Sequence, residues 1–405
     1  MHMKKKHLKI KVPGDKSITH RAMVLASMAR GKSVIINPLI CEDTMSTINA
    51  MKALGVDITF ENNTLIVKSK GLYEFMPPDN TIDCGNSATT MRMLMGLLAG
   101  QKFNSSLSGD SSLMSRPMLR VIEPLQQMGA DITSGENKYT IHGSTLHSIV
   151  YDMPVSSAQV KTALLLADFY ADRKSIINDP GNSRNHTELM LETYGKALKG
   201  RKIRIPGDVS SAAYLIAKAL ITPDSDIKLL DVGINPARTG YIDILKRMGA
   251  DISISGIRRY GREKAADISV RYSHLKATDI SGDIIPRVID ELPLIAVLAC
   301  FAEGTTTIRD AAELRVKESD RITSIVTGIN LIGGNACEKA DGMDITGSAD
   351  AMFCPAEIET NSDHRIAMSF LILSDLIPEL KVKNKECVAV SYPTFFKDIT
   401  SLFYS

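Results

Sequence analysis

The repeating pattern of this chain first appears in the stretch Val12-Pro13-Gly14-Asp15-Lys16-Ser17-Ile18-Thr19-His20-Arg21. Alternating apolar residues from Leu8 predict a strand that ends at the Pro-Gly turn. The apolar run that follows predicts a helix to about Ala29. Asp15 and Ser17 are typical capping residues for the beginning of such a helix. The stretch therefore predicts a strand, a turn and a helix in immediate succession.

The beginning of this predicted helix is a candidate anion-binding site. Ser17 and Arg21 are four residues apart and share one helix face, with Lys16 directly ahead. A helix N-terminus offers unpaired backbone N–H groups and a partial positive charge. A lysine, a hydroxyl and an arginine added there favour phosphate or carboxylate. A capped surface helix could carry the same residues, so the interpretation depends on whether the pattern is repeated.

The pattern occurs six times. A polar turn opens an apolar helix at residues 14–17, 84–87, 154–157, 207–210, 290–293 and 362–365. A second helix is predicted after each of them, at residues 43–54, 116–128, 187–198, 241–248, 320–332 and 393–403. Glycines such as Gly55, Gly129 and Gly249 fit helix C-caps, and the alternating residues after them fit strands. The spacing of roughly 50 to 80 residues is too long for a solenoid and indicates whole βαβ-type modules.

Six modules in 405 residues predict two domains of three modules each. The seam nearest the middle is the turn Ile205-Pro206-Gly207-Asp208. In an alternative arrangement the N-terminal strand crosses back to the second domain, which adds a hinge near Pro13-Gly14. Two hinge strands side by side would let the lobes close over a substrate.

Composition excludes several classes of protein. The formal net charge is only +2, which argues against a nucleic-acid binder that depends on a bulk positive field. The chain is 44% apolar but has no run long enough to span a membrane. The basic N-terminus lacks the apolar core of a secretory signal. We therefore expect no nucleic-acid or membrane partner.

Cysteine and histidine usage indicates neither a metal site nor a disulfide framework. The six cysteines show no CxxC spacing, and the eight histidines are equally scattered. A reduced, cytoplasmic setting is the simplest inference.

Cationic residues dominate the module beginnings, and they are Lys16, Arg21, Arg92, Arg116, Arg184, Lys317, Arg321 and Arg365. In the densest segment, 313–321, a helix is expected to begin, with Lys317 and Arg321 facing the same way and Glu318 beside them. For that segment alone a salt-bridged helix beginning is the simpler interpretation. Eight such residues across both halves favour convergence on a highly anionic ligand or pair of ligands.

Asp290 and Glu318 are the carboxylates best placed to do chemistry among these cations. Asp290 could equally be a helix N-cap, and Glu318 could simply pair with Arg321. Nearby cations keep a carboxylate ionised, which suits a base, whereas an acid needs partial burial. The spacing leaves open which of the two is acid and which is base.

Several motifs, read in order, resemble the enolpyruvyl transferase family over essentially the whole chain. They are residues 14–17 with Arg21, 85–92, 109–110 with 116–118, 157–159, 183–184, 290–293, 315–321 and 363–365. The resemblance implies an α/β fold of two lobes, each of three βαβαββ units around buried parallel helices (an inside-out α/β barrel). It also favours the crossing arrangement, with residues 1–13 plus 206–405 in one lobe, 14–205 in the other, and hinges near Pro13-Gly14 and Pro206-Gly207.

The resemblance further implies transfer of the enolpyruvyl group of phosphoenolpyruvate to the 5-hydroxyl of shikimate 3-phosphate, with release of phosphate through a tetrahedral intermediate. This step belongs to the shikimate pathway of aromatic amino acid biosynthesis. The ligands carry roughly −5 to −6 of charge. The clustered cations would repel one another without them, so an open enzyme that closes on binding is expected. Neither a metal nor an organic cofactor is implied, and we expect a monomer.

Residue roles also follow from the resemblance. Expected shikimate 3-phosphate contacts are Lys16, Ser17, Arg21, Ser157, Ala158, Gln159, Arg184, Asp290 and Lys317. Expected phosphoenolpyruvate contacts are Lys16, Asn86, Ala88, Arg92, Arg116, Gln159, Arg321 and Arg365. Asp290 resembles the residue that accepts the proton of the 5-hydroxyl, with Lys317 as the other candidate base. Glu318 resembles the acid that protonates the methylene carbon.

Two departures from the family pattern matter. Many members carry a lysine just before the last aromatic-proline motif, but residues 389–393 contain none. Many also have glycine where this chain has Ala88. The added methyl group would crowd an inhibitor longer than phosphoenolpyruvate, and the pattern resembles the glyphosate-insensitive class. Ala88 could instead be a helix-favouring substitution.

Two alternatives remain. The related transferase that acts on UDP-N-acetylglucosamine usually has a reactive cysteine in the loop before the Arg-Pro pair, but here residues 109–116 contain Ser111 and no cysteine. A non-catalytic anion-binding scaffold would not need Asp290, Lys317 and Glu318 together.

Overall fold

The computed structural model describes residues 8–181, 183–195 and 197–403. It separates into two compact units. Unit 1 comprises Met1–Pro13, Pro206–Arg259 and Lys264–Ser405, and unit 2 comprises Gly14–Ile205 and Tyr260–Glu263. Within the range 206–405, the four residues Tyr260–Glu263 cluster with unit 2. These residues form the turn between strands β13 (Asp251–Tyr260) and β14 (Glu263–Arg271), a hairpin longer than its counterparts.

All six module-opening helices are confirmed. Those of unit 2 are α1 (Lys16–Met28), α3 (Ala88–Ala99) and α6 (Ala158–Ala167). Those of unit 1 are α8 (Val209–Ile221), α11 (Leu292–Ala299) and α13 (His364–Leu371). They are buried helices, and in α8 and α11 every residue is buried. Most begin with a side-chain cap; at α1 the Asp15 carboxylate accepts the Ile18 N–H at 2.8 Å.

The six second helices are also confirmed, as α2 (Glu42–Ala53), α5 (Leu119–Gln127), α7 (His186–Tyr194), α9 (Gly240–Arg247), α12 (Arg321–Leu331) and α14 (Phe395–Phe403). Gly55, Gly129 and Gly249 follow three of them with φ of +85°, +96° and +92°. Glycine adopts this left-handed conformation without a steric penalty, so it ends these helices cleanly. Shorter helical segments are α4 (Ser111–Met114), α10 (Ile285–Val288), η1 (Gly282–Ile284), η2 (Ala312–Val316) and η3 (Lys385–Val390).

Unit 2 contains three sheets. The first has the order β11-β2-β4-β3 and is built from Lys202–Arg204, Gly31–Ile36, Thr64–Ser69 and Asp57–Glu61. The second has the order β5-β6-β8-β7 and is built from Ile82–Asp83, Ser105–Ser108, Lys138–His142 and Asp131–Gly135. The third pairs β9 (Val150–Asp152) with β10 (Ile176–Asn178) in parallel. Within the described residues of unit 2, this third sheet consists of the parallel pair alone, whereas the first two sheets also contain a hairpin.

Unit 1 repeats this plan. Its first sheet has the order β1-β12-β14-β13, with β1 at Leu8–Lys11 and β12 at Asp226–Gly233. Its second has the order β15-β17-β19-β18, and these strands span, in that order, Leu275–Lys276, Ala302–Ile308, Gly342–Gly347 and Asn335–Lys339. A fifth strand, β16 (Asp279–Ile280), also pairs with β17. Its third sheet again has only a parallel pair, β20 (Glu357–Ile358) with β21 (Lys381–Val382).

Two strands connect the units by exchanging partners. Strand β1 precedes α1 in the sequence but pairs in parallel with β12 of unit 1. Strand β11 precedes α8 but pairs in parallel with β2 of unit 2. The chain therefore passes from one unit to the other at Pro13–Gly14 and again at Ile205–Pro206.

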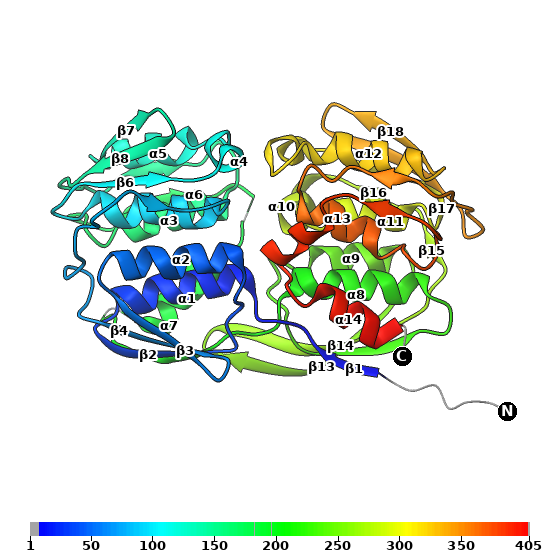
Figure 1. Ribbon diagram of the computed structural model, residues 1–405, viewed down its shortest axis with the longest axis horizontal. Helices are drawn as coiled ribbons and strands as arrows, with labels where there is room; N and C mark the ends of the chain where they lie inside the picture. Colours follow the sequence, from blue (N-terminus) through cyan, green and yellow to red (C-terminus); the bar gives the residue numbers. More distant parts are fainter. Residues whose placement is uncertain (1–7, 182, 196, 404–405) are drawn as a thin grey trace. The chain divides into compact units, whose positions relative to one another are not determined.

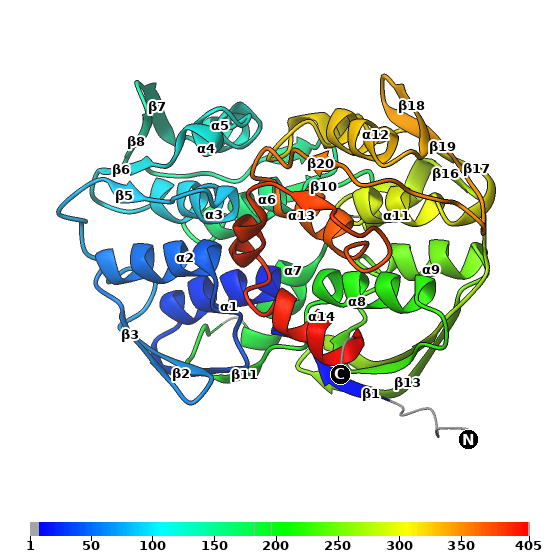
Figure 2. The same cartoon turned by 45° about the vertical axis from the view of Figure 1, so that its right-hand side comes forward.

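Each unit has its own hydrophobic core between sheets and buried helices. In unit 2, α3 and α6 lie together beneath the sheet that contains β6 and β8, and in unit 1 α11 lies beside α13 (Figures 1 and 2). None of the helices in the described part of the chain has the length and apolar character needed to span a bilayer. All six cysteines are free thiols.

The close approach of α3 and α6 depends on Gly96. A Cβ atom at this position would lie 2.0 Å from the carbonyl oxygen of Ala163, which is a backbone atom that cannot move aside cheaply. We predict that Gly96→Ala lowers the free energy of unfolding of unit 2 by about 1–3 kcal/mol or more, measured by denaturant melts. Gly135→Ala is the control, because its Cβ would meet nothing closer than 3.6 Å. Equal stability of the two variants would contradict the packing argument.

Candidate active site

The beginnings of the buried helices of unit 1 share one polar network. Its centre is Arg321, the first residue of α12 and one of the most deeply buried side chains in the unit. Its Nε lies 2.8 Å from Oδ2 of Asp363, which itself is fully buried and caps α13. A buried guanidinium requires this compensation, because an unpaired charge there would cost several kcal/mol (about 3–5).

Two further carboxylates reach the same guanidinium. Arg321 Nη2 lies 2.6 Å from Glu318 Oε2, and Nη1 lies 3.4 Å from Asp290 Oδ1. Burial alone would lower the pKa of Arg321, but the negative charges of Asp363, Glu318 and Asp290 raise it above its ordinary value. Arg321 therefore stays charged and gathers the two predicted catalytic carboxylates on one side chain.

Arg365 extends this network to α8 and α11. Its Nη2 lies 3.9 Å from Asp290 Oδ2, and its Nη1 lies 3.4 Å from Glu291 Oε1. Glu291 also accepts a 2.5 Å hydrogen bond from the Ser210 hydroxyl. Ser210 Oγ in turn accepts from Arg238 Nη2 at 2.6 Å. The carboxylate of Asp290 thus lies between two arginines, Arg321 and Arg365.

Two alternatives left open by the sequence are resolved by this geometry. The N-cap of α11 is Glu291, without a side-chain cap hydrogen bond, so Asp290 is not the cap. Glu318 does pair with Arg321, as one interpretation had it. Neither observation removes these carboxylates from the list of candidates, because both contact the buried arginine.

The position of Lys317 differs from the prediction made from the sequence. Lys317 was predicted to share a helix face with Arg321, but α12 begins only at Arg321. Lys317 follows the short turn η2, and its Nζ lies 3.6 Å from Glu313 Oε1. Burial lowers the pKa of Lys317, which the charges of Asp290 and Glu313 only partly offset. A lysine with a lowered pKa is easier to deprotonate and is a candidate base.

In unit 2, Arg21 is buried among hydroxyl groups. It donates from Nε to Thr187 Oγ1 at 2.8 Å, from Nη2 to Thr162 Oγ1 at 3.1 Å, and from Nη1 to the carbonyl oxygen of Ser17 at 2.9 Å. These three acceptors carry no charge, unlike the partners of Arg321. The contacts also bring together the beginnings of α1, α6 and α7.

Gln159, at the beginning of α6, connects α6 to α3. Its Oε1 accepts a hydrogen bond from Arg92 Nη1, and its Nε2 donates to Thr89 Oγ1 at 2.9 Å. Arg92 also donates to the carbonyl oxygen of Pro117 at 3.3 Å. The neutral amide therefore orients Arg92 without neutralising it.

Arg116 is oriented by Asn86, just ahead of α3. Its Nη2 donates to Asn86 Oδ1 at 2.5 Å and its Nη1 to the Asn86 carbonyl oxygen at 3.3 Å. Asn86 in turn donates to Asp110 Oδ2 at 2.7 Å. Ala88 is the first residue of α3, and its methyl group is buried.

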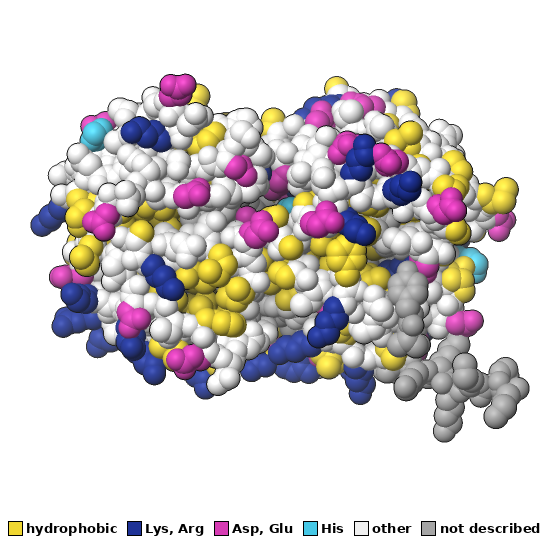
Figure 3. Space-filling model, viewed as in Figure 1, with side chains coloured by type: hydrophobic (Ala, Val, Ile, Leu, Met, Phe, Trp, Pro, Cys, Tyr) yellow, Lys and Arg dark blue, Asp and Glu magenta, His cyan; other side chains and the backbone are white. Residues whose placement is uncertain are grey.

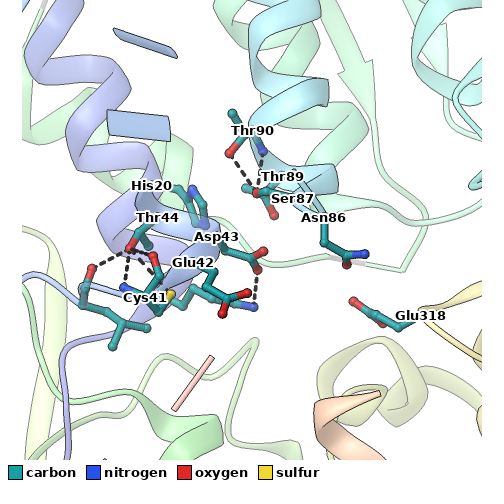
Figure 4. Close-up of polar contacts among 12 residues, drawn as sticks. His20, Cys41, Glu42, Asp43, Thr44, Asn86, Ser87, Thr89, Thr90 and Glu318 are labelled. Carbon is teal, nitrogen blue, oxygen red and sulfur yellow. Dashed lines mark hydrogen bonds and ion pairs between the residues drawn. The ribbon is translucent and has the colours of Figure 1, made fainter. Parts of the chain in front are cut away.

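Lys16 pairs with Asp43 at the beginning of α2, with Nζ 2.7 Å from Oδ2. Figure 4 shows Asp43 and His20 near the beginnings of α1 and α2, with Ser87 and Thr90 at the beginning of α3. Hydrogen bonds connect these helices through Thr47, which contacts His20 Nδ1 at 2.7 Å and Thr90 Oγ1 at 2.6 Å. Burial, and then the charges of Lys16 and Arg21, hold the pKa of His20 well below its ordinary value, so its imidazole is neutral.

The last predicted site residues of unit 2 flank α6. Ser157 caps the helix by accepting the Val160 N–H at 3.4 Å, and Ala158 is its first residue. Arg184 lies on the segment between β10 and α7. Lys161 holds this segment through Asp179 Oδ2 at 3.0 Å and the Ser183 carbonyl oxygen at 3.4 Å.

The two units differ in how their charges are balanced. In unit 1 the predicted cations lie among Asp290, Glu291, Glu318 and Asp363, whereas in unit 2 Arg21 and Arg92 are held mainly by neutral oxygens. Exposed lysines and arginines form a separate group along the lower left rim in Figure 3, over β2, β3 and β4. Within the described residues, no group of three or more potential ligands could hold a metal ion.

Several residues of these networks were missed from the sequence. They are Asp43, Thr89, Asp110, Lys161, Thr162, Asp179, Thr187, Ser210, Arg238, Glu291 and Asp363. Asp363 could have been found, because it occupies the capping position that Asp15 occupies in the first module. The threonines give no such signal, since their role depends on contacts between distant helices.

This fold and these helix-beginning networks define an enolpyruvyl transferase-type protein. The enolpyruvyl transferase NikO from Streptomyces tendae has the same fold, with a TM-score of 0.78 at 14% identity over 98% of this chain and 94% of that one. At this identity the likeness concerns the fold alone.

More similar relatives identify the family. A family model described as EPSP synthase (3-phosphoshikimate 1-carboxyvinyltransferase) matches residues 3–399. A 3-phosphoshikimate 1-carboxyvinyltransferase of Thermoanaerobacter sp. is 47% identical, covering 98% of this chain and 99% of the relative. EPSP synthase from Acinetobacter baumannii has a TM-score of 0.85 at 38% identity, covering 97% and 94% of the two chains. The chain therefore belongs to the EPSP synthase family.

The pair of Lys161 and Asp179 predicts a pH-dependent stability. Burial would raise the pKa of Asp179, but hydrogen bonds from Ser183 and the charge of Lys161 lower it from 3.8 to about 2. A carboxyl whose pKa is lower in the folded state stabilises that state above its unfolded pKa, and the contribution is lost as the pH falls through the folded pKa. We predict that Asp179→Asn costs about 2 kcal/mol at pH 7 and that its difference from the unaltered protein shrinks below pH 4.

Urea unfolding at pH 7, 5 and 3 measures this difference. Asp57→Asn is the control, because Asp57 pairs with Lys68 on the exposed side of unit 2 and such pairs contribute little. An effect of Asp179→Asn that is the same at all three pH values would contradict the role given to its charge.

Proposed function

We propose that this chain transfers the enolpyruvyl group of phosphoenolpyruvate to the 5-hydroxyl of shikimate 3-phosphate and releases inorganic phosphate, in the shikimate pathway. Membership of the EPSP synthase family supports the reaction. The single observation that carries the chemistry is the contact of Asp290 and Glu318 with one buried guanidinium, that of Arg321. An anionic substrate that binds this arginine would lie against both carboxylates.

Binding of the two anionic substrates is assigned mainly to unit 2. Ser17, Arg21, Ser157, Ala158, Gln159 and Arg184 are the proposed acceptor contacts, with Lys16 shared between both substrates. Asn86, Ala88, Arg92 and Arg116 are proposed for phosphoenolpyruvate, with Arg321 and Arg365 from unit 1. Arginine offers the paired N–H donors that carboxylate and phosphate prefer. Hydrogen bonds to threonine hydroxyls orient Arg21, and a hydrogen bond to the amide oxygen of Gln159 orients Arg92.

The chemistry is assigned to unit 1. Glu318 gives a proton to the methylene carbon, the 5-hydroxyl oxygen bonds to the adjacent carbon, and Asp290 or Lys317 takes the hydroxyl proton. The resulting tetrahedral intermediate then loses phosphate with the electrons of the broken C–O bond, and the Glu318 carboxylate takes back a proton from the new methyl group, which restores the double bond. The Arg321 guanidinium lies 2.6 Å from Glu318 Oε2, and such a contact stabilises the charged form of a carboxyl group. An anion that takes over the N–H groups of Arg321 would remove this stabilisation and let Glu318 carry the proton.

The remaining features of the proposal concern the setting of the reaction. The cations stabilise the leaving phosphate, so the reaction is proposed to need no metal or organic cofactor. Closure of the enzyme on its substrates at the two chain crossings, a monomeric state and a cytoplasmic location complete the proposal.

Phosphate release with different acceptors tests the reaction. The protein is incubated with phosphoenolpyruvate plus either shikimate 3-phosphate or UDP-N-acetylglucosamine, and inorganic phosphate is measured. We expect release with shikimate 3-phosphate alone. Release with the nucleotide sugar only, or with neither acceptor, would refute the proposal.

Conservative variants test the two carboxylates. Glu318→Gln and Asp290→Asn keep the shape of the side chain but cannot exchange the proton, so kcat should fall by about 10²–10⁴-fold. Shikimate 3-phosphate binding, measured by calorimetry, should change by no more than a few-fold. Glu338→Gln is the control, because Glu338 lies on the largely exposed strand β18, where it pairs with Arg315 of η2. Near-normal kcat in either variant would remove that residue from the mechanism.

Ala88 predicts weak inhibition by glyphosate. Its buried methyl group at the beginning of α3 leaves less room than the glycine of other family members. Ala88→Gly should tighten inhibition by glyphosate by about 10-fold or more, because one methyl group in a pocket discriminates by this amount. The inhibition constant is measured in competition with phosphoenolpyruvate, with Ala99→Gly at the other end of α3 as control. Tight competitive inhibition of the unaltered protein would contradict the assignment.

A further inference from the structure

The hairpin of β13 and β14 departs from the repeat. Its strands have 10 and 9 residues, whereas the hairpins β3–β4, β7–β8 and β18–β19 have strands of 5 or 6. The strands belong to unit 1 up to Arg259 and again from Lys264, but the turn Tyr260–Glu263 belongs to unit 2. The extra length therefore delivers four residues of this hairpin to the other unit.

The turn ends in a buried hydrogen-bond contact with α7. Glu263 Oε1 lies 2.6 Å from Nδ1 of His186, the first residue of α7. The two residues are only 7% and 1% exposed. A carboxylate this deeply buried needs a hydrogen-bonding partner, so removal of either side chain would leave the other in an unfavourable environment. The contact therefore holds the beginning of α7 firmly.

Further contacts fix the turn along the length of α7. Arg262 Nε lies 3.2 Å from Glu192 Oε2. Gly261 has φ of +62°, and a Cβ atom there would lie 2.8 Å from Thr193 Oγ1. The Arg204 guanidinium lies 5.2 Å from the centre of the Tyr260 ring. The turn thus contacts α7 both at its beginning and near its end.

The beginning of α7 supports the proposed acceptor site. Thr187, directly after His186, accepts the hydrogen bond from Arg21 Nε and also contacts Thr162 Oγ1 at 2.6 Å. Arg184 lies two residues before His186. His186 therefore lies between Arg184, one of the proposed phosphate-binding arginines, and Thr187, which accepts a hydrogen bond from the other, Arg21.

We infer that the contact of Glu263 with His186 positions the beginning of α7, and through it Arg21 and Arg184, for the phosphate of the acceptor. Glu263 and His186 are positioning residues, because neither is required to touch the substrate. The tip of the long hairpin, Tyr260–Glu263, thereby supports the proposed acceptor site of unit 2, to which it belongs. This inference rests on the proposed function, since it assigns the acceptor phosphate to Arg21 and Arg184.

Steady-state kinetics and calorimetry of four variants test the inference. Glu263→Gln removes the charge, and His186→Ala removes the ring. His186→Asn puts an amide nitrogen near the position of Nδ1, and Glu136→Gln alters the exposed turn of the ordinary β7–β8 hairpin. We expect Glu263→Gln and His186→Ala to raise the KM and the Kd for shikimate 3-phosphate by about 10-fold. The kcat and the KM for phosphoenolpyruvate should stay within about twofold.

The other variants separate positioning from general destabilisation. His186→Asn should recover most of the lost affinity, Glu136→Gln should behave as the unaltered protein, and the Glu263→Gln, His186→Ala double variant should be no worse than His186→Ala. Unchanged affinity in Glu263→Gln, or equal losses for both substrates, would overturn the inference.

Calorimetric titration with shikimate 3-phosphate alone keeps the two proposals distinguishable. If the unaltered protein binds it but shows no turnover, the proposed reaction fails, and the Kd values of the variants still decide the role of the hairpin. If turnover is normal and the Kd of Glu263→Gln is unchanged, only the hairpin inference fails. Absence of binding by the unaltered protein would overturn both.

Discussion

The polar centre of unit 1 depends on the contact between Asp363 and Arg321. One carboxylate caps α13 through the N–H of Arg365 and also contacts Nε of Arg321. Because both side chains are buried, the charge of each compensates the unfavourable burial of the charge on the other. Arg321 can then stay charged inside the protein and attract Asp290 and Glu318. Without this contact, Arg321 would lose the fully buried carboxylate that compensates its charge.

The buried arginines of unit 2 have different partners from those of unit 1. Arg21 and Arg92 are held by threonine hydroxyls, a glutamine amide and backbone carbonyl groups. Neutral acceptors orient a guanidinium through hydrogen bonds. Carboxylate partners in unit 1 place negative charge next to the arginines. The helix beginnings of the two units, although built from the same repeated module, thus differ in the kind of group that contacts their buried arginines.

Helices and their ends could be predicted from the sequence, because they depend on local signals. Apolar runs, capping residues and C-cap glycines such as Gly55 depend on neighbouring residues, and all twelve main helices were found from them. The prediction that Lys317 and Arg321 share a helix face was wrong. The short helix η2 ends just before Lys317, and α12 begins only at Arg321, four residues after Lys317. The pairing of β1 with β12 and of β11 with β2 needs contacts across more than 150 residues, which periodicity does not encode.

The departures from the repeat carry more information than the repeat itself. Six similar helix beginnings explain why polar residues gather at one end of each unit, but they do not explain why one hairpin is nearly twice as long as the others. A longer hairpin exposes more backbone and has a larger entropic cost of ordering. The buried contact of Glu263 with His186 offsets this cost and gives the extra residues a structural role beside Arg21 and Arg184. A local exception to the repeat thus places four hairpin residues beside α7 in unit 2.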